Sequence, residues 1–456
     1  DSMPVRLATC ILEKWETAKY DLYAAFIYRA HSFSKKNRIT ALITMHNFMY
    51  SPSFLDMRKQ IANWDWIQLL HLGTRAFSEI GGEVVQTAAF VLCNSSAKRN
   101  LAVCDLTEIK NADGKESAFC QHIAPTYVFN FKKIKSIPNY AFGYALSDVI
   151  FNFYDKNSTL ENKCVSKAGV VTGNDDFFCK LWFEVNLPDI TFLPDSHKLY
   201  KYVPFSRGGS FSSWYGNTHH VLRIEDMYND KLTNQSVRRG DIAFYYRTGI
   251  GWSQMGGGIN KKFSIIEKSI CKTTTPMLYC TNEDEMLSIL GYLNSPIPAK
   301  VLKSLNPTLS VLTSDILHLP FVPIMGDHIE TIADVKSCIQ LSREDADSYE
   351  TSWDFQIHPL LQYAALTPQR IAREEKNGYL PMNGIADAYR HWEQACDDRF
   401  YQLKANEEEL NRIFIDIYGL QDELTPEVED KDVTVRKAEL QRDIKSLISY
   451  AVGCMF

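Results

Sequence analysis

The N-terminal part of the chain alternates between helical patterns and apolar runs of strand length, and this alternation constrains the fold more than any other feature. Apolar residues recur with helical spacing over residues 7–36, and Pro52 suits the first position of a helix that runs to about Asn63. Near-continuous apolar runs, typical of buried strands, lie at 38–45, 66–72 and 84–92. This order of elements predicts the closing half of a doubly wound α/β domain with a parallel sheet.

The pattern changes near Cys164 and again near Met325. Between these points, short β-like runs alternate with glycine and asparagine turns, which predicts a mixed α/β domain. Beyond Met325, helical patterns dominate, most clearly at 331–343, 387–412 and 432–455. We therefore predict an α/β protein, α+β overall, in four segments. These are residues 1–105, a connector at 106–163, the mixed domain at 164–325 and a helical region at 326–456.

Composition limits the function classes that are open to the chain. The formal net charge of −6 argues against a polycation that binds nucleic acid by charge alone, although basic groups gathered on one face remain compatible with such binding. The 11 cysteines include no C-x-x-C pair, so the expected setting is reducing and cytoplasmic. No apolar run approaches the ~20 residues of a membrane span, and the first residues lack a signal-peptide pattern.

Two stretches in the mixed domain, residues 198–217 and 238–253, combine basic, aromatic, hydroxyl and glycine residues at high density. Lysine and arginine hold phosphates, glycine lets one backbone approach another, and aromatic rings stack on bases or wedge between them. This combination is typical of a surface that meets nucleic acid. The alternative is a glycine-rich β-domain whose aromatic residues are ordinary core.

The candidate DNA-contacting residues divide by chemistry. Arginines are predicted to contact phosphates or guanine edges, lysines to contact phosphates, amides to read adenine edges, and aromatic rings to wedge or stack. The arginines are Arg207, Arg238, Arg239 and Arg247; the lysines are Lys198, Lys201, Lys261 and Lys262; the amides are Asn174, Asn217 and Gln254; the rings are Trp214, Tyr215 and Trp252. Each residue alone is more often surface or core, so the prediction rests on the group.

Other kinds of site are not indicated. The glycines at 208–209, 249, 251 and 256–258 lack the P-loop and dinucleotide spacings. His219 and His220 have no cysteine, aspartate or histidine partner at ligand spacing, so no metal site is expected. The acidic run at 427–431 lies between predicted helices and does not indicate a nuclease.

A set of matching segments, spread over nearly the full length, gives the chain a family resemblance. The segments are 21–27, 43–49, 71–92, 173–177, 201–217, 249–253, 342–345, 350–355, 411–426 and 442–453. Through them the chain resembles the C-terminal part of the BREX phage-defence adenine DNA methyltransferases, the PglX family. That family is in turn similar to large restriction-modification enzymes that fuse methyltransferase and specificity domains.

The resemblance implies functions for the segments. Residues 1–105 would be the C-terminal part of a Rossmann-like methyltransferase domain, residues 164–325 a target-recognition domain, and residues 326–456 a clamp or spacer. The family's S-adenosylmethionine loop and Asn-Pro-Pro-aromatic motif are absent from the sequence, and the resemblance implies that both lie upstream of Asp1. The expectation is an S-adenosylmethionine-dependent N6-adenine methyltransferase as the intact protein. This segment by itself would be inactive and would bind no cofactor; its partners would be double-stranded DNA and other phage-defence proteins.

One candidate site lies in the first segment. His46, Asn47 and Phe48 follow a predicted strand at its carboxyl end, so they line a pocket for a flipped adenine or form a plain strand-to-helix turn. Residues 81–83 are expected to make a tight hairpin. Two further functions remain open for the whole segment: a non-catalytic specificity subunit that works with a separate catalytic chain, and a scaffold for a defence complex.

Overall fold

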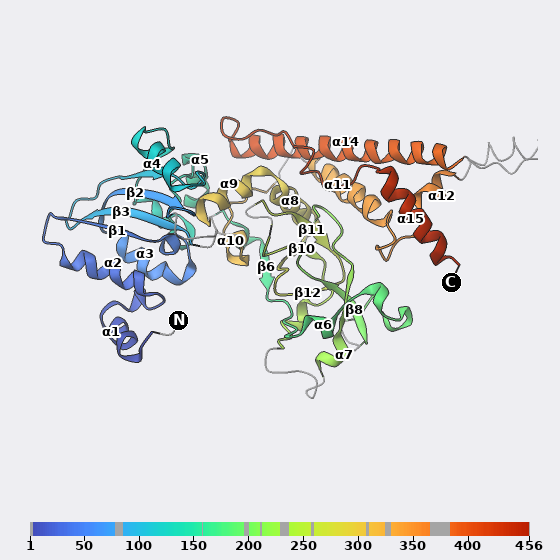
Figure 1. Cartoon of the computed structure of the whole chain (residues 1–456), viewed down its shortest axis with the longest axis horizontal. Helices are drawn as coiled ribbons and strands as arrows, with labels where there is room; N and C mark the ends of the chain where they lie inside the picture. Colours follow the sequence, from blue (N-terminus) through green and yellow to red (C-terminus); the bar gives the residue numbers. More distant parts are fainter. Residues whose placement is uncertain are drawn as a thin grey trace, which may run out of the picture. The chain divides into compact units, whose positions relative to one another are not determined.

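The computed structural model describes residues 3–77, 85–156, 158–195, 200–209, 212–228, 237–256, 260–306, 310–323, 330–364 and 384–455. The chain divides into two compact units. Unit 1 comprises Asp1–Ser158 and Val301–Pro307, and unit 2 comprises Thr159–Lys300 and Thr308–Phe456 (Figure 1).

Unit 1 is built on a five-stranded sheet with the order β1-β3-β2-β4-β5. The strands are β1 (Ile39–Met45), β2 (Asp65–Gly73), β3 (Thr87–Cys93), β4 (Leu101–Asp105) and β5 (Thr126–Phe129). β2 and β4 are parallel, whereas β3 runs antiparallel to both β1 and β2, and β5 runs antiparallel to β4. The predicted α/β class is confirmed, but the described sheet is mixed rather than parallel, because β3 inserts between β1 and β2. The hairpin predicted at 81–83 lies outside the described residues.

The helices of unit 1 are short, and the first three follow the predicted positions. They are α1 (Val5–Trp15), α2 (Leu22–Phe33), α3 (Leu55–Ile61), α4 (Ala112–Cys120) and α5 (Asp148–Asp155). The core is aromatic: the Trp66 ring lies 5.3 Å from that of Phe90 and 5.4 Å from that of Phe142, centroid to centroid. Residues 106–156, predicted as a connector, instead supply α4, β5 and α5 to this unit. β5 spans only four residues, and α4 carries a largely polar sequence, so neither gives a clear periodic signal.

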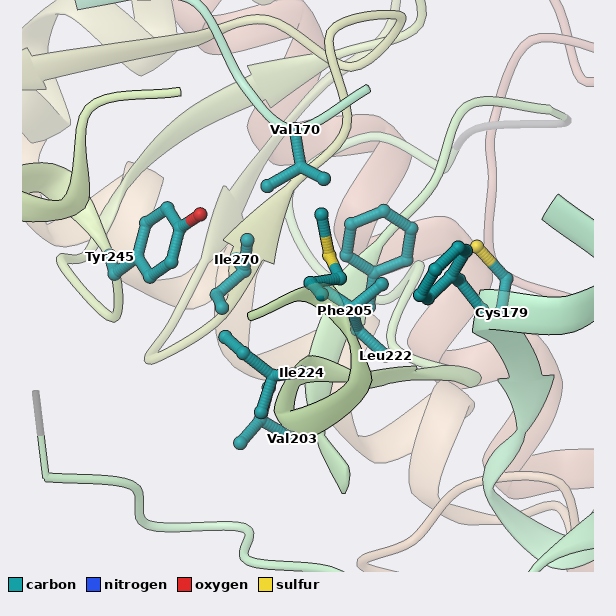
Figure 2. Packing of buried hydrophobic residues seen from close by; sticks show 10 residues of the cluster. Val170, Cys179, Val203, Phe205, Leu222, Ile224, Tyr245 and Ile270 are labelled. Atoms are coloured by element: carbon teal, nitrogen blue, oxygen red, sulfur yellow. The ribbon is translucent and has the colours of Figure 1, made fainter. Parts of the chain in front are cut away.

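Unit 2 contains two small sheets, with orders β11-β10-β13-β6 and β12-β8-β9-β7. Their strands are β6 (Cys164–Lys167), β7 (Cys179–Leu181), β8 (Tyr202–Ser206), β9 (His220–Arg223), β10 (Gly249–Trp252), β11 (Phe263–Ile266), β12 (Ile270–Cys271) and β13 (Met277–Cys280). Apart from the parallel pair β12–β8, the paired strands are antiparallel. Figure 2 shows the buried cluster that holds the second sheet, in which Phe205 of β8, Leu222 of β9 and Ile270 of β12 converge.

The remainder of unit 2 is helical, as predicted for the C-terminal region. Its helices are α6 (Asp175–Phe178), α7 (Ile224–Met227), α8 (Glu283–Asn294), α9 (Pro296–Leu305), α10 (Thr313–Leu317), α11 (Glu330–Asp347), α12 (Pro359–Ala364), α14 (Ile385–Tyr418) and α15 (Leu440–Gly453), with the end of α9 assigned to unit 1. α14 is 34 residues long, packs on α11, α12 and α8, and ends at Gly419, whose φ of 63° is the left-handed conformation that stops a helix. The predicted recognition and helical segments therefore pack as one compact unit.

Candidate nucleic-acid interface

The loops that follow three strands of unit 2 enclose a hollow, here called the loop hollow. Arg207–Gly209 follow β8, Ser253–Gly256 follow β10, and Lys272–Thr275 follow β12. The hollow is lined by Arg207, Gly208, Gly209, Ser253, Met255, Gly256, Lys272 and Thr274. It is therefore walled mainly by glycine, hydroxyl and basic residues, with one thioether.

Backbone hydrogen bonds hold these loops against one another. Lys272 N donates to the Ser206 carbonyl at 3.0 Å, and Gln254 N donates to the Thr274 carbonyl at 3.0 Å. A Cβ at Gly208 would lie 3.1 Å from the Thr274 carbonyl oxygen, so the close approach of the two loops favours glycine there. The Lys261 ammonium also donates to the Gln254 and Gly256 carbonyls, at 3.0 and 2.5 Å. Lys261 is thus an internal brace of its loop.

An acidic residue, Asp175, fixes the two cations of the loop hollow. Its carboxylate accepts a hydrogen bond from the Lys272 ammonium and lies 3.5 Å from the Arg207 guanidinium. Burial raises the pKa of Asp175, but hydrogen bonds from Lys272 and the Thr172 hydroxyl, together with the charges of Lys272 and Arg207, outweigh this and lower the pKa below its ordinary value. The carboxylate stays ionised and orients both cations, and a phosphate would compete with it for them.

The predicted base-stacking rings lie in the interior. Trp214 and Trp252 are 1% and 0% exposed, and Tyr215 is buried beneath the Arg343 guanidinium, 4.4 Å from the ring centre. The Trp214 indole donates to Glu407 Oε1 at 2.7 Å, and the Trp252 indole donates to the Val311 carbonyl at 3.3 Å. In this conformation none of the three offers a ring face to a base, because burial satisfies both the apolar and the polar part of each side chain.

The predicted amide readers are mostly occupied. Asn174 caps α6 by accepting from Phe177 N at 3.2 Å, and the Asn217 side chain bonds to the Ser212 backbone and to the Ser264 hydroxyl. Gln254 lines the depression next to the loop hollow and bonds weakly to Ser310 at 3.4 Å, and Asn217 lines a second cavity together with Arg207. Of the three amides, Gln254 has the longest side-chain hydrogen bond, whereas Asn174 caps a helix and Asn217 braces its own loop.

The other predicted cations are spread over unit 2. Arg238 and Arg247 are exposed, whereas Arg239 donates to the Met227 carbonyl at 3.0 Å and Lys201 pairs with Asp189 at 2.5 Å. Lys262 is half-buried near Glu407, and Lys198 lies outside the described residues. The structure therefore brings Arg207 together with Lys272, a residue that sequence analysis did not select. The sequence signal that could have identified Lys272 is its position, directly after an apolar strand and directly before three threonines at 273–275.

Of the three candidates in unit 1, only His46 joins a buried hydrogen-bond chain, and the three do not line an open pocket. His46 Nδ1 lies 2.8 Å from His71 Nε2, His71 Nδ1 lies 2.6 Å from the Tyr144 hydroxyl, and that hydroxyl donates to Asp105 Oδ2 at 3.0 Å. Phe48 is fully buried in the aromatic core, and only Asn47 is exposed.

Burial sets the protonation states of the two histidines in this hydrogen-bond chain. It lowers the pKa of His46 to about 3, with the neighbouring His71 adding to the shift, and it lowers the pKa of His71 to about 4. Both imidazoles are therefore neutral near pH 7. Because the Tyr144 hydroxyl donates to Asp105, it accepts from His71 Nδ1–H. The neutral His71 ring then accepts at Nε2 from His46 Nδ1–H, which leaves His46 Nε2 as an acceptor.

No metal centre or membrane helix is found in the described part of the chain. These residues contain no group of three or more histidine, cysteine, aspartate or glutamate side chains placed to hold a metal ion. None of their helices is long and apolar enough to cross a membrane.

Comparison with known proteins identifies two curated relatives over nearly the whole chain. The chain is 35% identical over 471 aligned positions to the adenine-specific methyltransferase PglX of Lacticaseibacillus casei (strain Zhang), covering 100% of this chain and 38% of that protein. It is 26% identical to the adenine-specific methyltransferase BrxX of Escherichia coli O9:H4 (strain HS), covering 97% of this chain and 36% of that protein. The chain thus spans less than two fifths of the length of these relatives. No protein-family model matches it.

One solved structure shares the fold of nearly the whole chain. The type IIL restriction-modification enzyme MmeI in complex with DNA superposes with a TM-score of 0.52 at 11% identity, covering 98% of this chain and 55% of that one. At this identity the likeness concerns the fold alone.

Proposed function

We propose that this chain, which belongs to the PglX family over its whole length, is the DNA-recognising portion of a site-specific adenine-N6 DNA methyltransferase of a prokaryotic phage-defence system. The relatives are named adenine-specific methyltransferases, and the MmeI structure that shares the fold is a DNA complex. The intact protein would transfer the methyl group of S-adenosylmethionine to adenine N6. Unit 2 would supply the contacts that select the DNA sequence.

The observation that carries this proposal is the pairing of Arg207 and Lys272 at the loop hollow. Both cations lie on loops with an open glycine backbone, and Asp175 holds them in a fixed geometry. Arginine and lysine in such a setting bind phosphates or the guanine edge in the major groove. Exposed Arg238 and Arg247 would add phosphate contacts, and Gln254 is the best placed amide for an adenine edge.

The cofactor and the chemical step are assigned to the part of the relatives that this chain does not span. The family's glycine-rich S-adenosylmethionine loop and its Asn-Pro-Pro-aromatic motif are both absent from the 456-residue sequence. We accordingly propose that this chain alone binds no S-adenosylmethionine and transfers no methyl group. The buried hydrogen bonds that link His46, His71, Tyr144 and Asp105 would stabilise the core of unit 1.

The test is binding of the 456-residue chain to fluorescent duplex DNA over a salt series. A DNA reader that neutralises several phosphates shows an association constant that falls linearly with salt on a log–log plot, with a slope of about −0.9 for each phosphate contacted. We expect this behaviour for random duplexes, with tighter binding to the recognised sequence. A folded chain that binds no duplex at low salt would contradict the proposal.

A further inference from the structure

Two cysteines face each other across neighbouring strands of unit 2. Cys164 is the first residue of β6 and Cys280 is the last residue of β13, and the two residues lie directly opposite one another in this antiparallel pair. Their Sγ atoms lie 3.3 Å apart. Both are free thiols. The strand register thus brings into contact two sulfur atoms from positions 116 residues apart in the chain.

The strand geometry suits a covalent link between these sulfur atoms. Residues directly opposite on antiparallel strands have Cβ atoms about 4.5–5.5 Å apart, and a disulfide needs Cβ atoms about 3.5–4.5 Å apart with a sulfur–sulfur bond of about 2.05 Å. β6 is the edge strand of the sheet β11-β10-β13-β6 and spans four residues, so it can move toward β13 without separating two other paired strands. A side-chain rotation and a small strand shift therefore suffice to join the two thiols.

The two cysteines differ in their access to solvent. Cys164 is 5% exposed and belongs to the buried core, whereas Cys280 is partly exposed at the end of its strand. A small reactant in solution can thus reach Cys280 before it reaches Cys164. This difference favours Cys280 as the first thiol to react and Cys164 as the second.

The surroundings of Cys164 support the same order. The hydrogen bond with Cys280 raises the pKa of the Cys164 thiol most, followed by burial and by the charges of Cys280 and Glu285, while the charge of Lys163 opposes the shift. Two of these causes come from the Cys280 thiol and disappear once its sulfur is bonded to another sulfur. Cys164 is therefore a poor nucleophile in the free pair and a better one after Cys280 has reacted.

Metal binding is not indicated at this cysteine pair. Two thiolates provide only half of the four ligands of a structural zinc site. Over the ranges that the structure describes, no group of three or more histidine, cysteine, aspartate or glutamate side chains is placed to hold a metal ion. Oxidation to a disulfide is the reaction that two neighbouring thiols support without a further ligand.

We propose that Cys164 and Cys280 form a reversible dithiol–disulfide site that reacts with small disulfides such as glutathione disulfide. The Cys280 thiolate attacks one sulfur of glutathione disulfide, which forms a mixed disulfide and releases one glutathione thiolate. The Cys164 thiol then loses its proton to solvent, its thiolate attacks the Cys280 sulfur, and the second glutathione thiolate leaves. Both released thiolates take up a proton. The two cysteines lose two electrons, and glutathione disulfide gains them.

This site goes beyond the proposed recognition of DNA and does not depend on it. The disulfide would join the edge strand β6 covalently to β13. Reduced glutathione reverses the reaction, because its thiolate can attack the sulfur of the partly exposed Cys280. The pair is accordingly a thiol modification site whose oxidised state holds β6 more firmly on the sheet than its reduced state does.

The test is oxidation of the whole folded chain with glutathione disulfide, followed by acid quenching, alkylation of free thiols and peptide mass spectrometry. We expect a peptide pair linked through Cys164 and Cys280, at least tenfold more abundant than any other cysteine link, which reduced glutathione removes. In Cys164→Ala, Cys280 should retain glutathione as a mixed disulfide; in Cys280→Ser, Cys164 should stay a free thiol. Cys120→Ser, which removes an exposed cysteine of unit 1, is the matched control and should leave the link unchanged.

Thermal unfolding of the same samples measures the hold on β6. Oxidation should raise the Tm of the parent chain by about 3–10 °C and should leave that of Cys280→Ser unchanged. The proposal is overturned if the folded parent chain keeps glutathione on Cys280 without forming the link, if the link forms only in denaturant, or if oxidation lowers the Tm. None of these results bears on the DNA proposal, which the salt series tests separately.

Discussion

The two units use the same kinds of residue in opposite ways. In unit 1, Arg58 is fully buried, and its guanidinium donates to the carbonyls of Asn139, Phe48 and Ser51 at 2.7–2.9 Å. In unit 2, Arg207 lies at a loop hollow with its side chain 38% exposed and a carboxylate beside it. One arginine cross-links backbone, whereas the other stays available to a phosphate. Residue type alone does not separate these roles, but the groups that satisfy each guanidinium do.

Removal of the buried cross-link has the largest expected effect. Arg58→Met should lower the free energy of unfolding by about 3–5 kcal/mol, because three carbonyls lose a charged donor inside the core. Burial lowers the pKa of Arg58 to about 9, because the apolar core disfavours the charged form of the guanidinium. Denaturant unfolding checks the loss, and the DNA affinity of the folded variant should be unchanged. A loss below about 1 kcal/mol would mean that the three hydrogen bonds contribute little.

A smaller loss is expected from the hydrogen-bond chain of unit 1. Tyr144→Phe leaves His71 Nδ1 and Asp105 Oδ2 without their shared partner, at a cost of about 1–3 kcal/mol. Denaturant unfolding again gives the value. The matched control is Tyr401→Phe on α14, which removes the same hydroxyl from an exposed ring. It should lower the free energy of unfolding by about 0.5 kcal/mol or less. If both variants lost the same free energy of unfolding, the buried hydrogen bonds of Tyr144 would contribute no more to stability than an exposed hydroxyl does.

The two units should respond to pH with opposite signs. In unit 1 the lowered pKa values of His46 and His71 mean that the unfolded state binds more protons, so stability falls as the pH drops from about 6.5 toward 4. In unit 2, burial raises the pKa of Glu407 to about 7, although the Trp214 hydrogen bond and the charge of Lys262 oppose the shift and the charges of Asp432 and Glu408 support it. The folded state then binds more protons, and stability falls as the pH rises from about 4.5 to about 7.

Glu407→Gln isolates the second effect. Between pH 5 and pH 8 the parent chain should lose about 1–3 kcal/mol of unfolding free energy that the variant keeps, because the variant has no carboxyl group to ionise at this position. Denaturant unfolding at the two pH values measures it. A difference that does not change with pH would show that Glu407 titrates normally and that its bond to Trp214 does not depend on protonation.

The smallest effect concerns the carboxylate at the loop hollow. Asp175→Asn removes the competitor for Arg207 and Lys272, so affinity for non-specific duplex DNA should rise about 2- to 5-fold at low salt, with a smaller change for the recognised sequence. Asp189→Asn, which releases Lys201 away from the hollow, is the control. Fluorescence anisotropy with random duplexes distinguishes the two variants. An unchanged or weaker affinity for Asp175→Asn would mean that the carboxylate positions the cations more than it competes for them.

The sequence predicted the order of elements better than the exposure of their side chains. The near-continuous apolar runs correctly predicted the strands β1, β2 and β3, and β2 and β3 are largely buried. β1 is instead an edge strand with Ile39 and Ile43 exposed, so its apolar run did not mean burial on both faces. The density of aromatic residues in 198–217 suggested stacking, yet Trp214 is core, because its partner Glu407 lies far along the chain on α14. The pairing of Arg207 with Lys272 and Asp175, and of His46 with His71, likewise depends on long-range contacts that local spacing does not encode.

The most direct test of DNA recognition by unit 2 compares two double variants of equal charge change. Arg207→Gln with Lys272→Gln removes the cations of the loop hollow, and Arg412→Gln with Lys431→Gln removes an arginine and a lysine that pair with surface glutamates elsewhere in the unit. In a salt series with duplex DNA, the first pair should weaken binding about 10- to 100-fold and reduce the log–log slope by about 2, while the second should leave both nearly unchanged. Equal losses for the two pairs would mean that net charge, rather than the loop hollow, drives binding, and would contradict the assignment of unit 2 as the DNA reader.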